Sequence, residues 1–377
     1  MILFNLLNRR LGYKYSNYIG NLFAGAIMNP HPPIVTSILS YGMSGEVFHA
    51  PLLSAHPNFR LKSVLQRTSD RAKAHHPGVQ VVRSLDEVLN DAEVELVIVN
   101  TPNETHFDFT AKALEAGKHA VVEKPFTNTV DDARKLIALS KKANKTLSVF
   151  QSRRWDGAFM TLKEIVTSGI LGQIVEYEAH YDRFRNYIAP NTWKEEPGPG
   201  SGILYNLGSH MLDQVLVLFG KPAFVSARIG TQRPGGRVDD FYDLRLEYPG
   251  LNVIVKSSYL VREPGPLYVV HGLLGSFMKY GLDPQEDALK LHQIPGTPGW
   301  GTEPEKFWGK LNTEIDGLHF EGKIETLPGN YLGFYQNIYE VIREGKELVV
   351  QPEQAMEVIH LIETAMKSSN ERKAIAY

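Results

Sequence analysis

The chain has 377 residues, which is enough for two domains of ordinary size. Its hydrophobic fraction of 43% and charged fraction of 22% are those of a globular protein. A formal net charge of -2 gives no electrostatic reason to expect nucleic acid or an anionic membrane as a partner, and the absence of cysteine excludes disulfides, thiolate nucleophiles and cysteine-bound zinc.

The first 33 residues are expected to form an extension outside the core fold. They begin with an apolar run and continue into Arg9 and Arg10, which is the reverse of the order in a secretory signal. We therefore discount export, expect a cytoplasmic location, and regard Met28 as the biological start. No apolar run in the sequence approaches the length of a membrane span.

Residues 34–152 show the alternation of strands and helices that is typical of a doubly wound parallel sheet. Strands are predicted at 34–39, 61–65, 79–82, 96–99, 119–122 and 147–150, and helices at 47–55, 84–89, 105–116 and 129–143. This order predicts an α/β domain that binds a dinucleotide.

The turn after the first strand has the composition of a phosphate-binding loop. Its residues are Ser40, Tyr41, Gly42, Met43, Ser44 and Gly45. Gly42 would let the backbone approach a pyrophosphate, and Gly45 would let the next helix pack closely on the strand. Glycine is usual where Ser40 stands, and many strand-to-helix turns carry two such glycines. The prediction therefore depends on the strand before the turn and the helix after it.

The second predicted strand ends in Gln66-Arg67-Thr68-Ser69. NAD-specific sites place an acid here for the ribose 2′-hydroxyl, and none is present. A guanidinium binds phosphate bidentately, so we predict that Arg67 and Thr68 bind the 2′-phosphate of NADP, with NAD the less favoured cofactor. The alternative is a solvated turn in which Ser69 caps a helix.

The fifth predicted strand ends in Glu123-Lys124-Pro125. Open α/β sheets bind ligands at the carboxyl ends of their strands, and partial burial there would lower the pKa of Lys124 toward working pH. Pro125 would hold the lysine at a fixed angle. The alternative is a surface lysine in a strand-to-helix turn, and only the order of the neighbouring elements favours a catalytic role.

From residue 153 to 377 the pattern becomes that of an α+β domain, which we interpret as a domain for substrate binding and oligomerisation. Strands are predicted at 174–185, 223–231, 242–248, 253–259, 268–271 and 276–279, and helices at 159–167, 203–219, 331–342 and 353–368. Residues 186–202 are expected as a loop and 283–328 as an irregular excursion. The pattern predicts an open, largely antiparallel sheet with helices on one face.

The order of the motifs resembles that of the Gfo/Idh/MocA family of NAD(P)-dependent oxidoreductases. These motifs are the glycine turn, Thr101-Pro102-Asn103, Glu123-Lys124-Pro125, Arg153-Arg154-Trp155-Asp156 and Gly208-Ser209-His210-Met211-Leu212-Asp213. Within the family, segments 47–51, 153–156 and 285–289 most resemble the NADP-dependent scyllo-inositol dehydrogenases. The resemblance covers the chain from residue 34 onward.

The resemblance implies hydride transfer between the nicotinamide ring and a secondary alcohol or ketone of a cyclic polyol or sugar. It implies Lys124 as the acid and base, with His210 and Asn206 at the substrate. The bond before Pro125 is often cis in the family. The further cofactor-binding residues that it implies are Thr101, Pro102, Asn103, His106, Glu123, Lys124, Arg153 and Trp155.

Several of these residues have structural alternatives. A lone helical histidine such as His210 is more often packed in a core, and for His49 we expect packing. Arg153 can be an ordinary solvated arginine, and Trp155 an interface residue.

Three residues, Tyr177, Tyr181 and Arg183, share one face of the strand predicted at 174–185. They line either a substrate pocket or a subunit contact. In the family the exposed face of the second sheet pairs subunits, and an exposed apolar face would be unusual in a monomer, so we expect a homodimer or a tetramer. No cluster of His, Asp and Glu has metal-ligand spacing, so we expect no metal.

Most family members have aspartate where Asn206 stands. Asparagine can hydrogen-bond a hydroxyl or orient Lys124, but it carries no negative charge to stabilise the ammonium. We therefore expect a lower pKa for Lys124 than an aspartate neighbour would give, and the alternative is impaired chemistry. Two rival functions remain, a reductase of a non-sugar carbonyl such as a dihydrodiol, and an NADP-binding regulator without turnover.

Overall fold

The computed structural model describes residues 31–190 and 192–377. The expectations for Met28 and for the extension before residue 31 lie outside these residues. No helix among the described residues is long and apolar enough to cross a membrane.

The first part of the chain forms sheet A, a six-stranded sheet in the order β3-β2-β1-β4-β5-β6. All its strand pairs are parallel. The strands are β1 (Ile34–Ile38), β2 (Phe59–Leu65), β3 (Gln80–Val82), β4 (Leu96–Val99), β5 (His119–Val122) and β6 (Leu147–Val149). The strand order reverses between β1 and β4, which is where open α/β sheets bind their ligands. The predicted parallel sheet is confirmed.

Two helices of this part, α5 (Leu85–Leu89) and α7 (Val130–Ala143), begin at side-chain caps that the sequence provides. Ser84 accepts from the Glu87 N–H and forms a capping box, and Thr129 accepts from the Asp132 N–H. The helices are α3 (Ala50–Ala55), α4 (Ala72–His75), α5 (Leu85–Leu89), α6 (His106–Glu115) and α7 (Val130–Ala143). The π-helical turn η1 (Ser44–His49) precedes α3, and the 3-10 turn η2 (Asn103–Thr105) precedes α6.

The second part forms sheet B, a nine-stranded sheet in the order β14-β13-β12-β11-β7-β10-β9-β8-β15. Its pairs are antiparallel except β7 with β10. The strands are β7 (Ile174–His180), β8 (Phe224–Gly230), β9 (Phe241–Tyr248), β10 (Leu251–Ser258), β11 (Tyr268–Gly272), β12 (Gly275–Lys279), β13 (Gly309–Ile315), β14 (Leu318–Ile324) and β15 (Ile375–Ala376). A largely antiparallel second sheet is thus confirmed.

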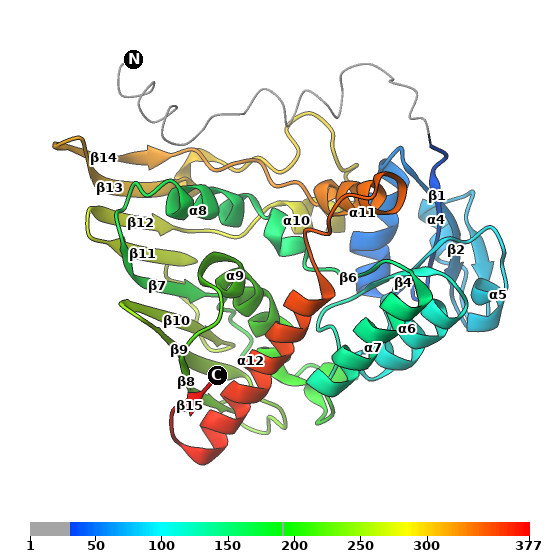
Figure 1. The fold of residues 1–377 in the computed structure, drawn as a ribbon, viewed down its shortest axis with the longest axis horizontal. Helices are drawn as coiled ribbons and strands as arrows, with labels where there is room; N and C mark the ends of the chain where they lie inside the picture. Colours follow the sequence, from blue (N-terminus) through cyan, green and yellow to red (C-terminus); the bar gives the residue numbers. More distant parts are fainter. Residues whose placement is uncertain (1–30, 191) are drawn as a thin grey trace.

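Helices cover one face of sheet B (Figure 1). The helices of this half are α8 (Gly157–Thr167), α9 (Ser209–Phe219), α10 (Gln285–Lys290), α11 (Leu332–Glu344) and α12 (Pro352–Glu371). Short turns accompany them: η3 (Ser152–Trp155), η4 (Trp193–Glu195), the π-helical η5 (Leu204–Gly208) and η6 (Glu305–Phe307). Helix α12 runs between the two sheets and contacts α7, α9 and β8.

Two expectations for this half were wrong. The strand predicted at 174–185 ends at His180, because beyond it the backbone bonds only intermittently along β10. The excursion at 283–328 contains α10 and the β13–β14 hairpin. Asp316 and Gly317 form the hairpin turn, with φ of 51° and 79°, which is the conformation that Asp-Gly favours between two strands.

The uncovered face of sheet B is mostly polar, although Ile254, Val269 and Met278 also lie on it. Side chains that alternate with the core residues pair across neighbouring strands, as in Lys256 with Asp243 and Lys310 with Glu321. The argument for a dimer from an exposed apolar face is therefore not supported, and the oligomeric state stays a prediction.

Two hydrophobic cores fill the molecule. One lies around sheet A and also includes Phe334, Tyr335 and Ile338 of α11, while the other lies between sheet B and its helices. Helix α12 serves both, since Ile359 belongs to the first core and Ile362 to the second. The division at residue 152 stays a prediction, because side chains from both sides of it share the first core.

Candidate active site

The glycine turn lies at the carboxyl end of β1, beside the end of β4. An ideal Cβ at Gly45 would lie 2.1 Å from the Ser40 carbonyl oxygen, so only glycine fits there. The same oxygen accepts from Asn100 Nδ2 at 2.8 Å. At Gly42 a Cβ would meet nothing closer than Ser40 Oγ at 3.5 Å, so the fold itself does not require glycine. The space left at Gly42 suits a phosphate that approaches the backbone.

Of the other side chains of the turn, Tyr41 is buried and Met43 is exposed. Tyr41 packs edge-on against His76, whereas Met43 is 54% exposed. The Tyr41 carbonyl oxygen accepts from Arg71 at 2.8 Å. The sequence analysis did not single out Arg71. The only sequence signal for its role is that it follows Arg67 by four residues.

Arg67 and Thr68 are exposed at the end of β2. The guanidinium of Arg67 has no hydrogen bond or ion pair with any described residue, so it is available to a ligand. Ser69 does not cap α4: it accepts from Gln66 Nε2 at 2.7 Å, and Gln66 Oε1 accepts from the Ala72 N–H at 2.9 Å. The capping alternative for this segment was therefore wrong.

The turns after β4 and β5 are joined by His106. Its ring nitrogens lie 2.8 Å from the Pro125 carbonyl oxygen and 3.0 Å from that of Thr101. After Pro102, the Asn103 side chain donates to the Gly200 carbonyl oxygen at 2.8 Å, which ties this turn to the loop before η5. His106 thus connects the two turns through their backbone oxygens, and its side chain is buried.

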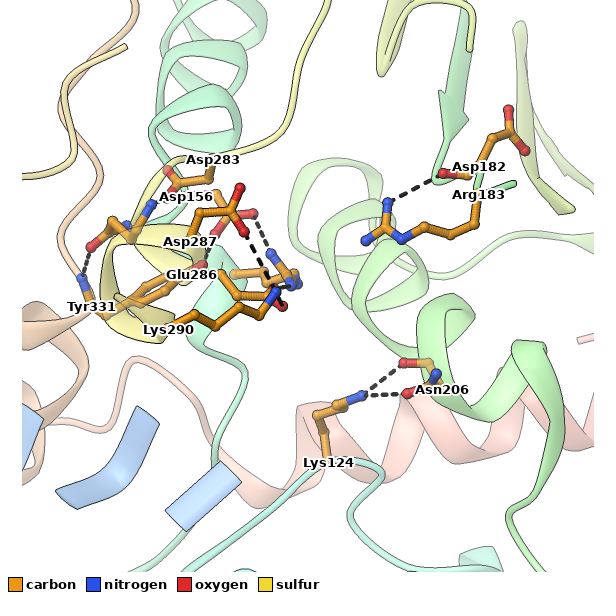
Figure 2. Close-up of polar contacts among 12 residues, drawn as sticks. Lys124, Asp156, Asp182, Arg183, Asn206, Asp283, Glu286, Asp287, Lys290 and Tyr331 are labelled. Carbon is orange, nitrogen blue, oxygen red and sulfur yellow. Dashed lines mark hydrogen bonds and ion pairs between the residues drawn. The ribbon is translucent and has the colours of Figure 1, made fainter. Parts of the chain in front are cut away.

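Lys124 follows β5, and its bond to Pro125 is cis. Its Nζ donates to the backbone oxygen of Asn206 at 2.7 Å and to Asn206 Oδ1 at 3.3 Å (Figure 2). Burial lowers the pKa of Lys124 to about 8, with the charges of Lys194 and Arg153 acting in the same direction and those of Glu123 and Glu286 opposing it. A lysine with this pKa can both donate and accept a proton near neutral pH.

Asn206 lies in η5, where the chain is wound as a π-helix: the Ser209 N–H bonds to the Leu204 oxygen, five residues earlier. Single π-helical turns inside helices recur at functional sites. Here the turn brings both oxygens of Asn206 to Lys124.

A chain of buried hydrogen bonds holds Lys124 from the opposite side. Tyr335 OH lies 2.7 Å from His49 Nδ1, and His49 Nε2 lies 3.1 Å from Glu123 Oε1. Glu123 Oε2 accepts from the Lys124 N–H at 3.0 Å. Burial would raise the pKa of Glu123, but the bond to His49 and the nearby Lys124 together lower it. His49 is packed, as expected, and the sequence analysis missed its contact with Glu123.

His210 lies in the first turn of α9. It is 8% exposed, and its Nδ1 is buried without a hydrogen-bond partner among the described residues. Burial and the positive charges of Lys124 and Arg153 hold its pKa well below the ordinary value, so the ring is neutral. Because Nδ1 is closed off from solvent, the nitrogen of this neutral imidazole that can hydrogen-bond a substrate hydroxyl is Nε2.

Arg153 is buried and paired. It donates to Glu286 Oε2 at 2.6 Å and to Asp156 Oδ2 at 3.3 Å, and Tyr331 OH donates to Asp156 Oδ1 at 2.7 Å (Figure 2). Burial raises the pKa of Asp156 to about 7 against the opposing charge of Arg153. The expected alternative of a solvated arginine was wrong.

The three aromatic candidates, Trp155, Tyr177 and Tyr181, lie in different surroundings. Trp155 packs edge-on against Phe334 in the first core, with ring centroids 5.7 Å apart. Tyr177 is fully buried against Phe219, so it is neither a pocket residue nor a subunit contact. Tyr181 lies close to the site, since the Arg153 guanidinium stands 5.2 Å from its ring centroid.

The described part of the chain contains no group of three or more His, Asp or Glu side chains placed to hold a metal ion.

Comparisons with known proteins identify the family of the chain. Residues 37–151 match the family model for the NAD-binding Rossmann fold of the oxidoreductase family GFO_IDH_MocA, and residues 163–376 match its C-terminal alpha/beta domain. The scyllo-inositol 2-dehydrogenase (NADP(+)) IolW of Bacillus subtilis (strain 168) is 40% identical over 91% of this chain and 95% of its own length.

A more distant relative and a solved structure also resemble this chain. The D-glucoside 3-dehydrogenase of Escherichia coli (strain K12) is 28% identical over 55% of this chain and 62% of its own. The solved structure of yvaA from Bacillus subtilis superimposes with a TM-score of 0.89 at 39% identity, covering 92% of this chain and 99% of that one. The chain therefore belongs to the Gfo/Idh/MocA family of oxidoreductases, and it is an NAD(P)-dependent dehydrogenase acting on CH–OH groups.

Proposed function

We propose that the protein transfers hydride between NADP and a secondary alcohol or ketone of a cyclic polyol or sugar, such as an inositol. The observation that carries the proposal is the position of Lys124. Its Nζ, with a pKa lowered to about 8, meets Asn206 at the carboxyl edge of sheet A, close enough to His210 to lower the pKa of that ring. The name of the inositol dehydrogenase relative supports a polyol as the substrate.

NADP rather than NAD is favoured by the side chains after β2. Arg67 and Thr68 are exposed there, and Arg67 is unpaired within the described residues. A guanidinium and a hydroxyl suit a 2′-phosphate. The open backbone at Gly42 and the close packing at Gly45 suit the pyrophosphate.

The residues of this chain supply proton transfer and orientation. When bound, the nicotinamide accepts or supplies the hydride. In the oxidation, the neutral amine of Lys124 takes the hydroxyl proton, and in the reduction its ammonium returns a proton to the same oxygen. As an ammonium it also stabilises negative charge on that oxygen. Neutral His210 and the side chain of Asn206 orient the hydroxyl.

A fluorescence titration of the full chain with NADPH and NADH in parallel tests the cofactor. NADPH is expected to bind more tightly, and Arg67→Gln to remove about tenfold or more of that preference while NADH affinity stays unchanged. Arg60→Gln, an exposed arginine on the same strand, is the matched control. A preference for NADH would contradict the assignment of Arg67.

Absorbance assays with inositols and aldoses then test turnover. NADP-dependent oxidation of at least one cyclic polyol or sugar is expected. Tight NADPH binding without turnover of any alcohol or ketone would contradict the proposal.

We also propose that the protein is a homodimer, paired through the uncovered face of sheet B. The charged pairs on that face would then meet a second copy, and light scattering at rising ionic strength measures whether the pairing weakens as such contacts are screened. A monomer at every salt concentration would exclude this arrangement.

A further inference from the structure

We propose that the substrate carries an oxyanion, a carboxylate or a phosphate, and that Arg183 binds it beside the reacting carbon. This inference rests on the proposed function, because it concerns the substrate of the same site. It follows from an account of the charges around Lys124.

Each carboxylate near Lys124 already has a partner. Glu286 accepts from Arg153 at 2.6 Å and pairs with Lys290 at 2.7 Å. Glu123 is held by His49 and by the Lys124 N–H.

The two aspartates of the site, Asp156 and Asp182, also have partners. Asp156 accepts from Tyr331 and Arg153, at 2.7 Å and 3.3 Å. Asp182 Oδ1 accepts from the Ser258 N–H at 3.0 Å, and its Oδ2 lies 3.6 Å from His180.

Two cations, in contrast, have no carboxylate partner among the described residues. Lys124 Nζ meets only the two oxygens of Asn206. Arg183 donates to the carbonyl oxygen of Asp182 at 3.2 Å and otherwise lies over the Tyr181 ring, 4.4 Å from its centroid. Asn206 carries no charge, so the site has a surplus of cations without an ion-pair partner, although the charges of Glu123 and Glu286 oppose the lowering of the Lys124 pKa.

The stack on Tyr181 brings Arg183 toward the site. The same ring lies 5.2 Å from the Arg153 guanidinium, which contributes to lowering the pKa of Lys124 and of His210. In Figure 2 the Arg183 side chain extends from the end of β7 toward the helix that follows Asn206, and Lys124 reaches the turn of Asn206 from sheet A. Stacking also restricts the guanidinium, which lowers the entropy lost when it binds an anion.

Further positive charge surrounds this pair. Burial lowers the pKa of both Lys124 and Lys194, and the charge of Lys194 on Lys124 and that of Arg185 on Lys194 act in the same direction, against the charges of Glu123 and Glu286. The phosphates of a dinucleotide do not account for the surplus, because the residues that suit them follow β1 and β2 of sheet A, whereas Arg183 follows β7 of sheet B. A guanidinium binds a carboxylate or phosphate bidentately, and a neutral polyol offers it no such partner.

Pairs of substrates matched in stereochemistry test the inference. The full chain with saturating NADP is assayed with glucose, glucuronate and glucose 6-phosphate, and with galactose and galacturonate. At least one acidic member is expected to have a kcat/KM about tenfold or more above its neutral counterpart, as one charge-assisted contact would give. Glucuronate and glucose 6-phosphate distinguish a carboxylate from a phosphate. The preference is expected to fall as salt rises.

Variants assign the preference to Arg183. Arg183→Gln is expected to raise KM for the acidic substrate about tenfold, with NADPH affinity unchanged. Asn206→Asp, which adds a negative charge at Lys124, is expected to lower the acid-to-neutral ratio of kcat/KM. Arg134→Gln, an exposed arginine of α7, makes the same change of charge away from the site and is the matched control.

The outcomes separate this inference from the proposed function. Turnover of neutral members at rates equal to or above the acidic ones, with no selective effect of Arg183→Gln, would overturn the inference and leave the proposed function standing. NADPH binding without turnover of either member of any pair would overturn both. Titration of the NADPH complex with glucuronate and with glucose gives a second readout, in which equal affinities count against the inference.

Discussion

Lys124 is the residue on which the chemistry of the site depends, and burial is the largest influence on its pKa. Its Nζ meets two oxygens of Asn206 and no carboxylate, and the charges of Glu123 and Glu286 offset the effect of burial only in part. The pKa of about 8 predicts opposite pH dependences for the two directions. Oxidation needs the neutral amine, so its kcat/KM should rise with pH through about 8, whereas reduction needs the ammonium and should fall through the same range. Initial rates in both directions, from about pH 6 to about pH 10, measure this pH dependence over about two units on each side of that pKa.

The charge at position 206 provides the second test at this scale. Asn206→Asp places a carboxylate at Lys124 and should move both pH profiles to higher pH, because an opposite charge favours the ammonium. Asn206→Ala, which keeps the backbone oxygen that accepts at 2.7 Å, should leave the profiles close to those of the wild type. Titration of Lys124 by NMR reads the pKa directly. Equal values in the wild type and Asn206→Asp would refute the electrostatic argument.

His49 acts on the lysine from within the first core. His49→Phe removes the partner of a buried carboxylate, so we expect a loss of about 1–3 kcal/mol in the free energy of unfolding and a lower kcat, since Glu123 no longer fixes the backbone of Lys124. Tyr335→Phe removes only the outer hydroxyl and should cost about 1 kcal/mol with kcat retained. Urea unfolding and steady-state kinetics measure both. Equal kcat values in the wild type and His49→Phe would show that the chain of bonds only stabilises the fold.

At the scale of elements, the glycine turn between β1 and α3 separates a folding requirement from a binding requirement. Gly42→Ala adds a Cβ that meets only an ordinary contact, so Tm should stay unchanged while NADPH affinity falls about tenfold or more. Gly45→Ala drives a Cβ against the Ser40 oxygen and should lower both Tm and affinity. Thermal scans and fluorescence titrations distinguish the two variants. Undiminished NADPH binding by Gly42→Ala would mean that the phosphates do not approach this backbone.

The elements also show which features local sequence can predict. The strands of sheet A were found because buried parallel strands are continuous apolar runs, as in β4. The β13–β14 hairpin was missed although Asp316-Gly317 is a strong turn signal, because the glycines and prolines around it suggested a loop. Strand β7 was predicted too long because the alternation continues past His180, where the backbone bonds only intermittently with its neighbours.

The site was predictable only in part, for a physical reason. Lys124 and Asn206 are 82 residues apart, and no local pattern brings them together, so the resemblance to a family carried that prediction. His49 and Tyr335, 286 residues apart, were not connected at all, because a packed histidine and a helical tyrosine carry no sequence signal of their partnership. Arg183 was singled out as a residue of a pocket or a subunit contact, but its lack of a carboxylate partner among the described residues required the fold.

At the scale of the whole molecule, Arg154 joins the segment between the two sheets to α9 of the second core and to α12, which both cores share. It donates to Asp213 of α9 at 2.7 and 2.8 Å, to the Val349 carbonyl oxygen at 2.7 Å and to Gln354 of α12 at 2.9 Å. The side chains of Arg154 and Asp213 are 6% and 3% exposed, so this is a desolvated pair. Because α12 packs in both cores, we expect the two parts of the molecule to unfold together.

Removing one member of that pair tests the coupling. Asp213→Leu leaves a buried guanidinium without its carboxylate and should cost about 3–5 kcal/mol in the free energy of unfolding. The double variant Arg154→Met/Asp213→Leu should recover part of that loss, because two packed apolar side chains replace two buried charges. Glu353→Gln, which breaks the exposed pair with Lys141, should not measurably change the free energy of unfolding.

Urea unfolding followed by both circular dichroism and NADPH fluorescence should give coincident transitions in the wild type. Two separate transitions would mean that sheet A and sheet B are stable independently, and that α12 and Arg154 connect them without making them cooperative.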